Sequence, residues 1–479
     1  MYSLLVRTLA VIGCVVSFLF LLSPIRLLLV APVGLGLWWL WKMKDRVSFQ
    51  HTIEWIERNR VWILAIIIMG GILSRFGFSW MLGIDERILG YDGIILWDHA
   101  KGLCAGIWVM SKSWCTVMFY GGIIGLFGPS ILAMLISISI LDGVTIFIGY
   151  LIVKRWCGVC SAIIFSISLA FSPFFIHKIQ FSSEHLYGFF FMMSLLMFTF
   201  AYESIFKQSK VRMFFYSVMA GCCMWFTTWS RGEGILLWII VPAFMIVLCF
   251  IGKIRWRASW VMIGTLYLMG TLGAFVGYTI NVNTNGTQTV FCSNDNLWPR
   301  LFGAKFETNG EYNNDDVPLL WHRYLEDCSN AKSLPENYEV LTIEKFHGGQ
   351  GNVPKEAVKY IKEEIALRWR NMNLWKKITF IKRKFSNDWL QEDCFVFQEN
   401  EPLDIIKLGL VAVFPTFFSC SSFLFFLSVF RRKYEPYLLS WCVLLCIIGN
   451  IGLLTLTESS SRYGWLLYQI WGIYGAVFV

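Results

Sequence analysis

The chain is built from long apolar runs, and this feature limits its possible folds more than any other. Many runs approach or exceed the ~20 residues that a helix needs to cross the hydrocarbon core of a bilayer. They show no alternation of polar and apolar residues, so they do not fit the strands of a membrane β-barrel. Only 15% of the residues are charged, whereas a soluble protein carries about 25%. The sequence therefore predicts an all-α, polytopic membrane protein.

Hydropathy predicts about twelve transmembrane helices. Their expected ranges are 3–22, 25–41, 61–79, 130–153, 157–173, 186–202, 213–229, 235–251, 259–280, 404–430, 437–456 and 463–479. The first run has no convincing cleavage site for a signal peptide, so we interpret it as a retained helix. The apolar segment 114–128 is short and rich in glycine. We expect it to be re-entrant or interfacial, with a thirteenth span as the alternative.

The positions of Lys and Arg predict the orientation of the chain in the membrane. Basic residues occur in segment 42–60 and then in every second loop, which the positive-inside rule assigns to the cytoplasm together with the N-terminus. The outer loops are then 80–129, 174–185, 230–234, 281–403 and 457–462. The net charge of +9 follows from this topology and does not indicate nucleic acid. The expected location is the plasma (inner) membrane, with a site on the extracytoplasmic side.

The distribution of charge also divides the chain into four parts. These are an N-terminal helical hairpin with a basic cytoplasmic linker (1–60), a transmembrane core (61–280), an extracytoplasmic loop domain (281–403) and C-terminal transmembrane helices (404–479). Within the loop domain, segments 353–372 and 374–389 have the apolar spacing of amphipathic helices. Their many basic residues form either a solvated face or a face that attracts lipid phosphate at the outer membrane surface.

Acidic, basic and aromatic residues gather at the predicted outer ends of the core helices. A carboxylate there costs desolvation energy unless water, a cation or a polar substrate meets it. Each residue alone could be a helix cap or a surface ion pair, but their shared side of the membrane favours function. The set comprises Asp85, Glu86, Asp92, Asp98, His177, Lys178, Glu184, His185, Arg231, Glu233, Glu458, Arg462 and Tyr463.

Two further features are weaker signals. Asp142 lies within a predicted span, where a carboxylate is either functional or satisfied by neighbours such as Ser137 and Ser139. Cys157 and Cys160 form a CxxC pair at a helix end with no second pair nearby. A packing role fits them better than a zinc or redox site, and the sequence predicts no metal ligands.

The order of several short motifs resembles a known family. Arg75, near the end of the first core helix, precedes an outer-loop aspartate, an aromatic residue and an Ala-x-x-Leu helix. The later motifs are GLFGPS before a span, Pro173 followed by Ser183 and Glu184, Thr227-x-x-x-Arg231 and Glu458-x-x-x-Arg462-Tyr463. From about Val61 to the C-terminus the chain resembles the GT-C class of membrane glycosyltransferases. Within that class it is similar to the protein O-mannosyltransferases and bacterial lipid A aminoarabinose transferases, a family 39-like group.

The loop aspartate of that family can be placed at two positions in this chain. Asp85 with Glu86 reproduces the Asp-Glu pair of those enzymes and lies ten residues beyond Arg75. Asp92 gives the better downstream fit, with Trp97 as the aromatic residue and Ala100 opening the Ala-x-x-Leu motif. Both positions remain open.

The resemblance implies that a sugar moves from a polyprenyl-phosphate donor to an acceptor of the cell envelope, which is a glycan, a lipid or a protein. Asp85, Asp92 or Glu86 would supply the general base. The substrate-binding residues implied are Arg75, His177, Lys178, Glu184, Arg231, Glu458, Arg462 and Tyr463. Arginine suits the departing phosphate because its planar fork makes two contacts. No cofactor is certain, and a divalent metal is left open; membrane lipid is an expected partner.

Two other functions fit the same sequence features less well. A transporter or flippase of lipid-linked glycans usually shows repeated halves and polar residues at mid-membrane. This sequence has no internal repeat, and its polar residues cluster at the outer ends of the predicted helices. A glycan polymerase or ligase would share the sidedness and the lipid-phosphate donor. These functions remain the alternatives to a glycosyltransferase.

Overall fold

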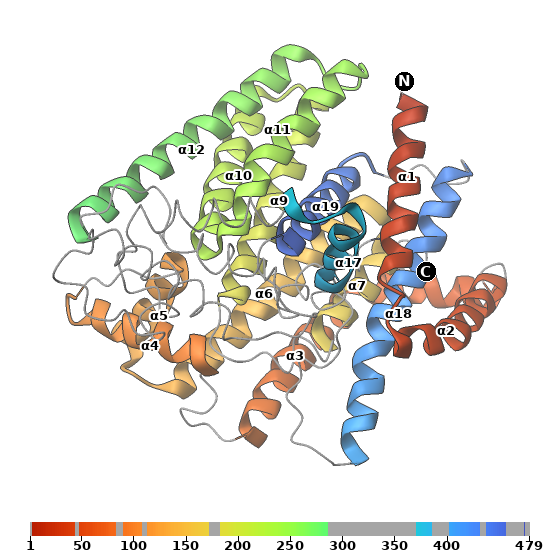
Figure 1. The fold of residues 1–479 in the computed structure, drawn as a ribbon, viewed down its shortest axis with the longest axis horizontal. Helices are drawn as coiled ribbons and strands as arrows, with labels where there is room; N and C mark the ends of the chain where they lie inside the picture. The colour runs from red at the N-terminus through yellow and green to blue at the C-terminus, as the bar shows by residue number, and fades with distance from the viewer. Residues whose placement is uncertain are drawn as a thin grey trace.

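The computed structural model describes residues 2–43, 47–82, 90–107, 113–171, 183–285, 370–385, 402–431, 437–456 and 474. Within these residues the fold is all-α (Figure 1). The helices are α1 (Tyr2–Leu19), α2 (Pro24–Met43), α3 (Val47–Leu82), α4 (Gly90–Cys104), α5 (Trp114–Phe127), α6 (Ile131–Cys157), α7 (Val159–Phe171), α9 (Glu184–Phe206), α10 (Lys210–Ser230), α11 (Ile235–Phe250), α12 (Trp256–Asn285), α17 (Leu374–Phe385), α18 (Pro402–Phe430) and α19 (Ser440–Leu456), with a 3₁₀ turn, η2 (Gly232–Gly234).

Each of the first eleven predicted spans coincides with one of these helices. Four of the helices contain stretches long and apolar enough to cross a membrane, namely Gln50–Gly77, Ile131–Cys157, Glu184–Phe206 and Trp256–Ile280. The other apolar helices are shorter, and the twelfth predicted span lies outside the described residues except for Tyr474. The chain is a multi-pass membrane protein, and the number twelve stays a prediction.

The surface of the helices supports immersion in lipid. Large apolar side chains point outward on several helices; for example, Leu28, Trp62 and Phe275 are 78%, 74% and 66% exposed. Soluble monomers rarely leave so many such side chains in contact with water. In a bilayer these side chains contact lipid tails and carry no penalty.

Helix α3 is much longer than the predicted span 61–79. It begins at Val47 and runs for 36 residues, about 54 Å at 1.5 Å per residue. The segment between Val47 and Arg60 contains no proline or glycine, so the basic linker continues the helix. Hydropathy missed this extension because its residues are polar.

The segment 114–128 forms α5, which packs on α4 and on the start of α6. Trp97 of α4, Tyr120 of α5 and Leu135 of α6 belong to one small buried cluster. Ser113 precedes α5 and Gly128, with φ of 73°, follows it. The helix of 14 residues is about 21 Å long, less than the ~30 Å of the hydrocarbon core, but α7, which matches a predicted span, has only 13 residues. Both interpretations of the segment therefore stay predictions.

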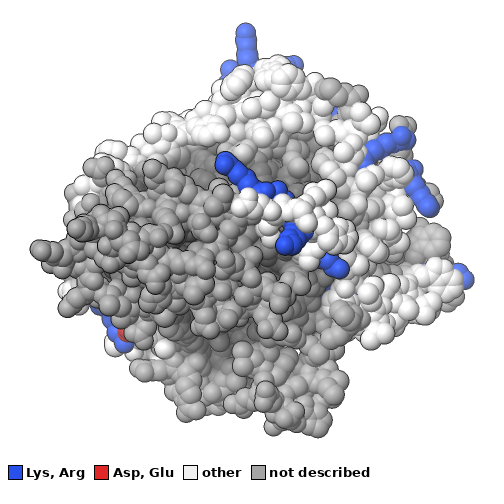
Figure 2. All heavy atoms as spheres, in the orientation of Figure 1, with Lys and Arg blue, Asp and Glu red and all other residues white. Residues whose placement is uncertain are grey.

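Two more predicted segments are found as helices. Helices α1 and α2 both pack on α18, and the hairpin stays a prediction. Segment 374–389 forms α17 over Leu374–Phe385, whereas the expected helix 353–372 lies almost wholly outside the described residues. Lys and Arg side chains appear on the visible face around α17 (Figure 2). On α17 itself, Lys376 and Lys382 are exposed. Attraction of this face to lipid phosphate stays a prediction.

A glycine lies where α3 packs against α6. A Cβ atom on Gly143 of α6 would lie 2.7 Å from the Cδ1 atom of Ile72 on α3. Real Cβ atoms do not approach other atoms so closely, so with a larger residue here at least the side chain of Ile72 would have to move. Asp142 precedes Gly143, and Arg75 lies about one turn beyond Ile72, so this contact lies beside their ion pair.

The predicted orientation can be tested with a native thiol. Cys104, at the end of α4, is an exposed free cysteine in a loop assigned to the outside. We expect a membrane-impermeant maleimide to label Cys104 in intact cells, as measured by mass spectrometry of the modified peptide. Cys104→Ser is the control. Labelling of Cys104 only after lysis would reverse the orientation.

Candidate functional site

The structure describes four of the predicted site residues and leaves the others outside its described part. Arg75 lies on α3, Asp92 in the first turn of α4, Glu184 at the start of α9 and Arg231 directly after α10. The residues outside are Asp85, Glu86, His177, Lys178, Glu458, Arg462 and Tyr463. Their assigned roles stay predictions.

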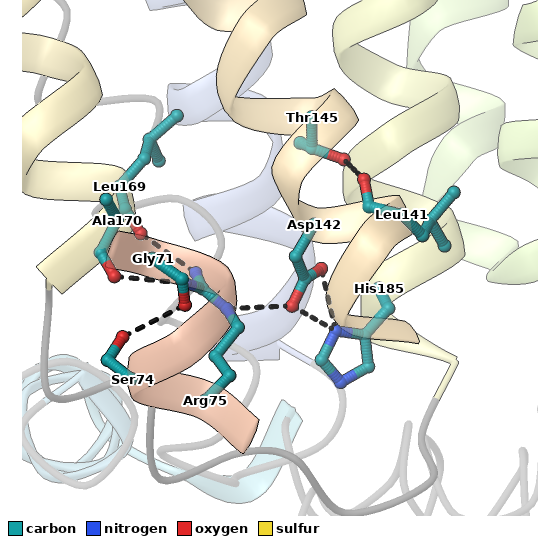
Figure 3. Close-up of polar contacts among 9 residues, drawn as sticks. All are labelled: Gly71, Ser74, Arg75, Leu141, Asp142, Thr145, Leu169, Ala170 and His185. Atoms are coloured by element: carbon teal, nitrogen blue, oxygen red, sulfur yellow. Dashed lines mark hydrogen bonds and ion pairs between the residues drawn. The ribbon is translucent and has the colours of Figure 1, made fainter. Parts of the chain in front are cut away.

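Arg75 is the centre of a buried polar cluster (Figure 3) and has no exposed surface. Its Nε donates to Asp142 Oδ2 at 3.0 Å, and its Nη1 donates to the Gly71 carbonyl of its own helix at 2.9 Å. Nη1 also donates to the Ala170 carbonyl at 2.9 Å, and Nη2 donates to the Leu169 carbonyl at 3.0 Å.

These contacts show what Arg75 does for the bundle. Leu169 and Ala170 lie in the last turn of α7, where carbonyls have no donor within the helix. A guanidinium there satisfies them and is favoured by the negative end of the helix dipole. Arg75 therefore joins the end of α7 to α3 and α6, whatever part it takes in binding substrate.

Asp142 also contacts an imidazole. The carboxylate is 2% exposed, and its two oxygens lie 3.0 and 3.1 Å from Nδ1 of His185 on α9. Buried charges require such partners because their desolvation is costly. The expectation that Ser137 and Ser139 satisfy Asp142 is wrong. Ser137 donates to the Ala133 carbonyl, and within the described structure the Ser139 hydroxyl has no partner.

A second ion pair involves Glu184, the residue that precedes His185. Arg231 Nη1 is 2.8 Å from Glu184 Oε1, and the two side chains are only 12% and 18% exposed. This ion pair therefore joins two helices. Consecutive residues of α9, Glu184 and His185, thus contact Arg231 at the end of α10 and Asp142 of α6.

The turn that carries Arg231 is held tightly. A Cβ atom on Gly234 would lie 2.6 Å from the backbone nitrogen of Thr228, so the chain folds back closely on α10. Trp238 of α11 donates its indole N–H to the Thr228 hydroxyl at 3.1 Å. Trp225 packs edge-on against Trp238, with ring centroids 5.9 Å apart. This packing fixes the position of Arg231 relative to α9.

Together these contacts bring several helix ends to one end of the bundle. Arg75 is near the end of α3, Leu169 and Ala170 end α7, His185 begins α9 and Arg231 follows α10. Asp142 lies about 16 Å along α6, so the first turns of that helix extend beyond the cluster. The sequence correctly predicts that Arg75, Glu184 and Arg231 share one end.

His99 on α4 is a polar residue that the sequence analysis did not select. It is seven residues beyond Asp92, a spacing that places both on one side of the helix. The imidazole is 8% exposed, and Nδ1 has no hydrogen-bond partner within the described structure. Burial lowers the pKa of His99, while the neighbouring carboxylate of Asp98 opposes that shift. The helix thus carries a buried imidazole seven residues from Asp92, one of the two candidate bases.

No protein-family model matches the sequence, and no match is found among curated proteins. Two solved structures of the oligosaccharyltransferase of the archaeon Archaeoglobus fulgidus have a similar fold. One, the apo form, shares 14% identity with a TM-score of 0.53. The other, AglB with an inhibitory peptide and a dolichol-phosphate, shares 12% identity with a TM-score of 0.51. The chain has a GT-C-like fold. Each match covers 88% of this chain and 50% of the archaeal one, so the chain spans about half the length of those proteins.

Within the described residues, no group of three or more His, Cys, Asp and Glu side chains could hold a metal ion. Asp85 and Glu86 lie outside that part of the chain. Among the described residues, Arg75 and His185 both pair with Asp142, and Arg231 pairs with Glu184. Asp98 pairs with Lys101. The pairing of Arg75 with Asp142 could have been anticipated, because an intramembrane acid needs a cation on a neighbouring span.

Proposed function

We propose that the protein is a membrane glycosyltransferase that moves a sugar from a polyprenyl-phosphate donor to an acceptor on the extracytoplasmic face. The observation that carries this proposal is the GT-C-like fold, which covers 88% of the chain. The archaeal AglB structure was determined with a dolichol-phosphate, which is a lipid phosphate of the class proposed here. The acceptor, which is a glycan, a lipid or a protein, and the sugar are left open.

In this proposal the loop after α3 supplies the chemistry. Asp92 or Asp85, with Glu86 beside the latter, accepts the proton of the acceptor hydroxyl or amine as it attacks the anomeric carbon. The bond between that carbon and the phosphate oxygen breaks, and its electrons go to the phosphate. Arg231 and Arg462 neutralise the departing phosphate, and Arg75 positions α3 and α7. His177, Lys178, Glu458 and Tyr463 complete the substrate contacts, and Glu184 pairs with Arg231.

The position of Asp92 supports this assignment. It lies in the first turn of α4, directly after the loop that follows the long helix α3. The same end of α3 carries Arg75, which is held against Asp142 at 3.0 Å. We therefore expect Asp92 to lie close to the end of α3 and α6, where the sugar of a lipid-linked donor would be presented while its tail stays in the bilayer. A divalent metal, if required, would bind to the loop carboxylates.

The purified protein provides the direct test. We expect incubation with a polyprenyl-phosphate sugar and candidate acceptors to release free polyprenyl phosphate and to form a new glycoside, both measured by mass spectrometry. Comparison of the surface glycans of the host with and without this gene identifies the sugar and the acceptor. Movement of an intact lipid-linked glycan across vesicles, with no glycosidic bond formed, would instead show a flippase. Elongation of the donor's own glycan would show a polymerase.

Arg231 gives a sharper prediction about the donor phosphate. Arg231→Lys keeps the charge that pairs with Glu184 but loses the two-pronged contact with phosphate. We expect the KM for the lipid donor to rise with little change in the KM for the acceptor. One charge-assisted contact is worth about 1.5–3 kcal/mol, on the order of ten- to a hundred-fold in efficiency. The same result is expected for Arg462→Lys.

Glu184→Gln is the matched comparison for Arg231→Lys, because it removes the ion pair and leaves the guanidinium in place. A rise in donor KM confined to Arg231→Lys would support phosphate binding. If both variants only lower the thermal midpoint, Arg231 has a structural role. A defect confined to the acceptor would assign it to the other substrate.

A further inference from the structure

Two neighbouring residues in the first turn of α9 each contact another helix. Nδ1 of His185 lies 3.0 and 3.1 Å from the two carboxylate oxygens of Asp142 on α6 (Figure 3). Oε1 of Glu184 lies 2.8 Å from Nη1 of Arg231, directly after α10. His185 is only 7% exposed, and the reaction proposed above gives this imidazole no role. It is a buried ionisable group one residue from the partner of the arginine assigned to the donor phosphate.

Apolar packing alone does not fix how this turn is oriented. Leu186 and Tyr187 are buried and hold the turn in the bundle. Such packing is non-directional, whereas a hydrogen bond fixes the distance and the angle between two groups. Among the described residues, Ser183 precedes the helix but its side chain makes no capping hydrogen bond. The contact of His185 with Asp142 therefore contributes strongly to the orientation of the turn.

The partner of His185 is itself held in place. An ionised carboxylate only accepts hydrogen bonds, so Nδ1 of His185 carries the hydrogen in this contact. Asp142 also accepts from Nε of Arg75 at 3.0 Å. Arg75 in turn donates to the carbonyls of Leu169 and Ala170 on α7. Contacts among α3, α6 and α7 thus set the position of the carboxylate, and through it that of the first turn of α9.

We propose that His185 is a positioning residue for the transfer reaction. Its hydrogen bond to Asp142 holds the start of α9 so that Glu184 keeps the guanidinium of Arg231 in the orientation that binds the donor phosphate. The two-pronged contact of arginine with phosphate needs this alignment. The inference rests on the proposed function, which assigns Arg231 to that phosphate. It concerns position and not charge, because Glu184→Gln keeps an oxygen that accepts from Arg231.

Two amide side chains distinguish the two ring nitrogens of His185. The side-chain nitrogen of asparagine is as many bonds from the backbone as Nδ1, so His185→Asn keeps a donor for Asp142. That of glutamine corresponds to Nε2, so His185→Gln should lose this bond. His185→Phe keeps the ring without a donor and takes its place if His185→Gln does not fold.

Leu186→Ala is the control for packing in the same turn. Leu186 is 3% exposed, so its truncation leaves a cavity and lowers the thermal midpoint. The side chain takes no part in either ion pair. If His185 served only to stabilise the fold, variants of His185 and Leu186 with equal thermal midpoints would bind the donor phosphate equally well.

The experiment measures the Kd of purified full-length variants for polyprenyl phosphate, together with their thermal midpoints. We expect His185→Gln to raise the Kd about ten-fold, and His185→Asn and Leu186→Ala to leave it within about two-fold. Arg231→Lys should itself raise the Kd. Adding His185→Gln to Arg231→Lys should raise it by no more than a further two-fold or so, because residues that act through one contact do not have additive effects.

The inference is overturned if His185→Gln binds like the unmodified protein, or if His185→Asn binds as weakly as His185→Gln. It also fails if the losses from His185→Gln and Arg231→Lys are additive, or if the unmodified protein does not bind polyprenyl phosphate. The proposed function is decided separately, by formation of a glycoside from the sugar donor by the unmodified protein. The expected pattern of Kd values without any transfer would reject the transferase and keep the positioning role of His185.

Discussion

Sugar transfer should fall by about 10²–10⁴-fold when the general base in the loop after α3 is replaced by its amide. Asp92→Asn and Asp85→Asn are the two variants, since both positions fit the base. Asparagine keeps the size of the side chain but does not accept a proton, so kcat should fall while the amount of protein in the membrane stays normal. The measurement is single-turnover formation of the glycoside by purified enzyme.

Asp98→Asn is the matched control for these variants. Asp98 lies on the same helix as Asp92, its side chain is 60% exposed, and its carboxylate lies 3.2 Å from the ammonium of Lys101. Loss of an exposed pair changes stability by at most about 1 kcal/mol, and we expect nearly normal activity. Full activity of both Asp85→Asn and Asp92→Asn would remove the proposed base.

The largest expected effect on stability is at the buried pair of Arg75 and Asp142. Asp142→Leu leaves the guanidinium without its carboxylate, and breaking a buried pair on one side costs about 3–5 kcal/mol. The double variant Arg75→Met with Asp142→Leu removes both charges and should recover much of that loss. Thermal unfolding of the purified protein in detergent, or the yield of monodisperse protein, measures both effects.

The double variant also separates charge from packing. Its recovery should be incomplete, because the methionine that replaces Arg75 cannot donate to the carbonyls of Leu169 and Ala170 at the end of α7. In both variants His185 also loses the carboxylate that its Nδ1 contacts, so this loss cancels in the comparison. A double variant as unstable as Asp142→Leu alone would mean that the carbonyl contacts, and not the ion pair, hold these helices together.

Hydropathy was enough to predict where most helices lie, because a long apolar run in a bilayer has few alternatives to a helix. It missed the first turns of α3, whose polar residues are helical because nothing between Val47 and Arg60 interrupts the backbone hydrogen bonds. Segment 114–128 could not be assigned from its composition. Its packing on α4 and α6 depends on Trp97 and Leu135, which belong to other parts of the chain.

The candidate site was predicted less completely than the fold. The positive-inside rule correctly placed Arg75, Glu184 and Arg231 at one end of the bundle, because it follows the direction of each span. It could not predict which side chains touch. The contact between Arg231 and Glu184, for example, joins the ends of two helices that are 47 residues apart in the sequence. Asp142 was matched to nearby serines, whereas its partners come from α3 and α9.

The Arg75–Asp142 pair also bears on how the protein is made. Asp142 follows Arg75 by 67 residues, so at about 5–20 residues per second the ribosome adds it roughly 3–13 s later. During that interval the guanidinium of Arg75 lacks its carboxylate, and ~2.5–3.5 kcal/mol, the cost of an arginine at a helix centre in the bilayer, is the upper limit of the penalty for this position near the helix end. We expect the nascent helix α3 to stay beside the insertion machinery until α6 and α7 emerge and supply the carboxylate and the carbonyls. The order of synthesis thus delays the release of α3 into the membrane until α6 and α7 have been synthesised.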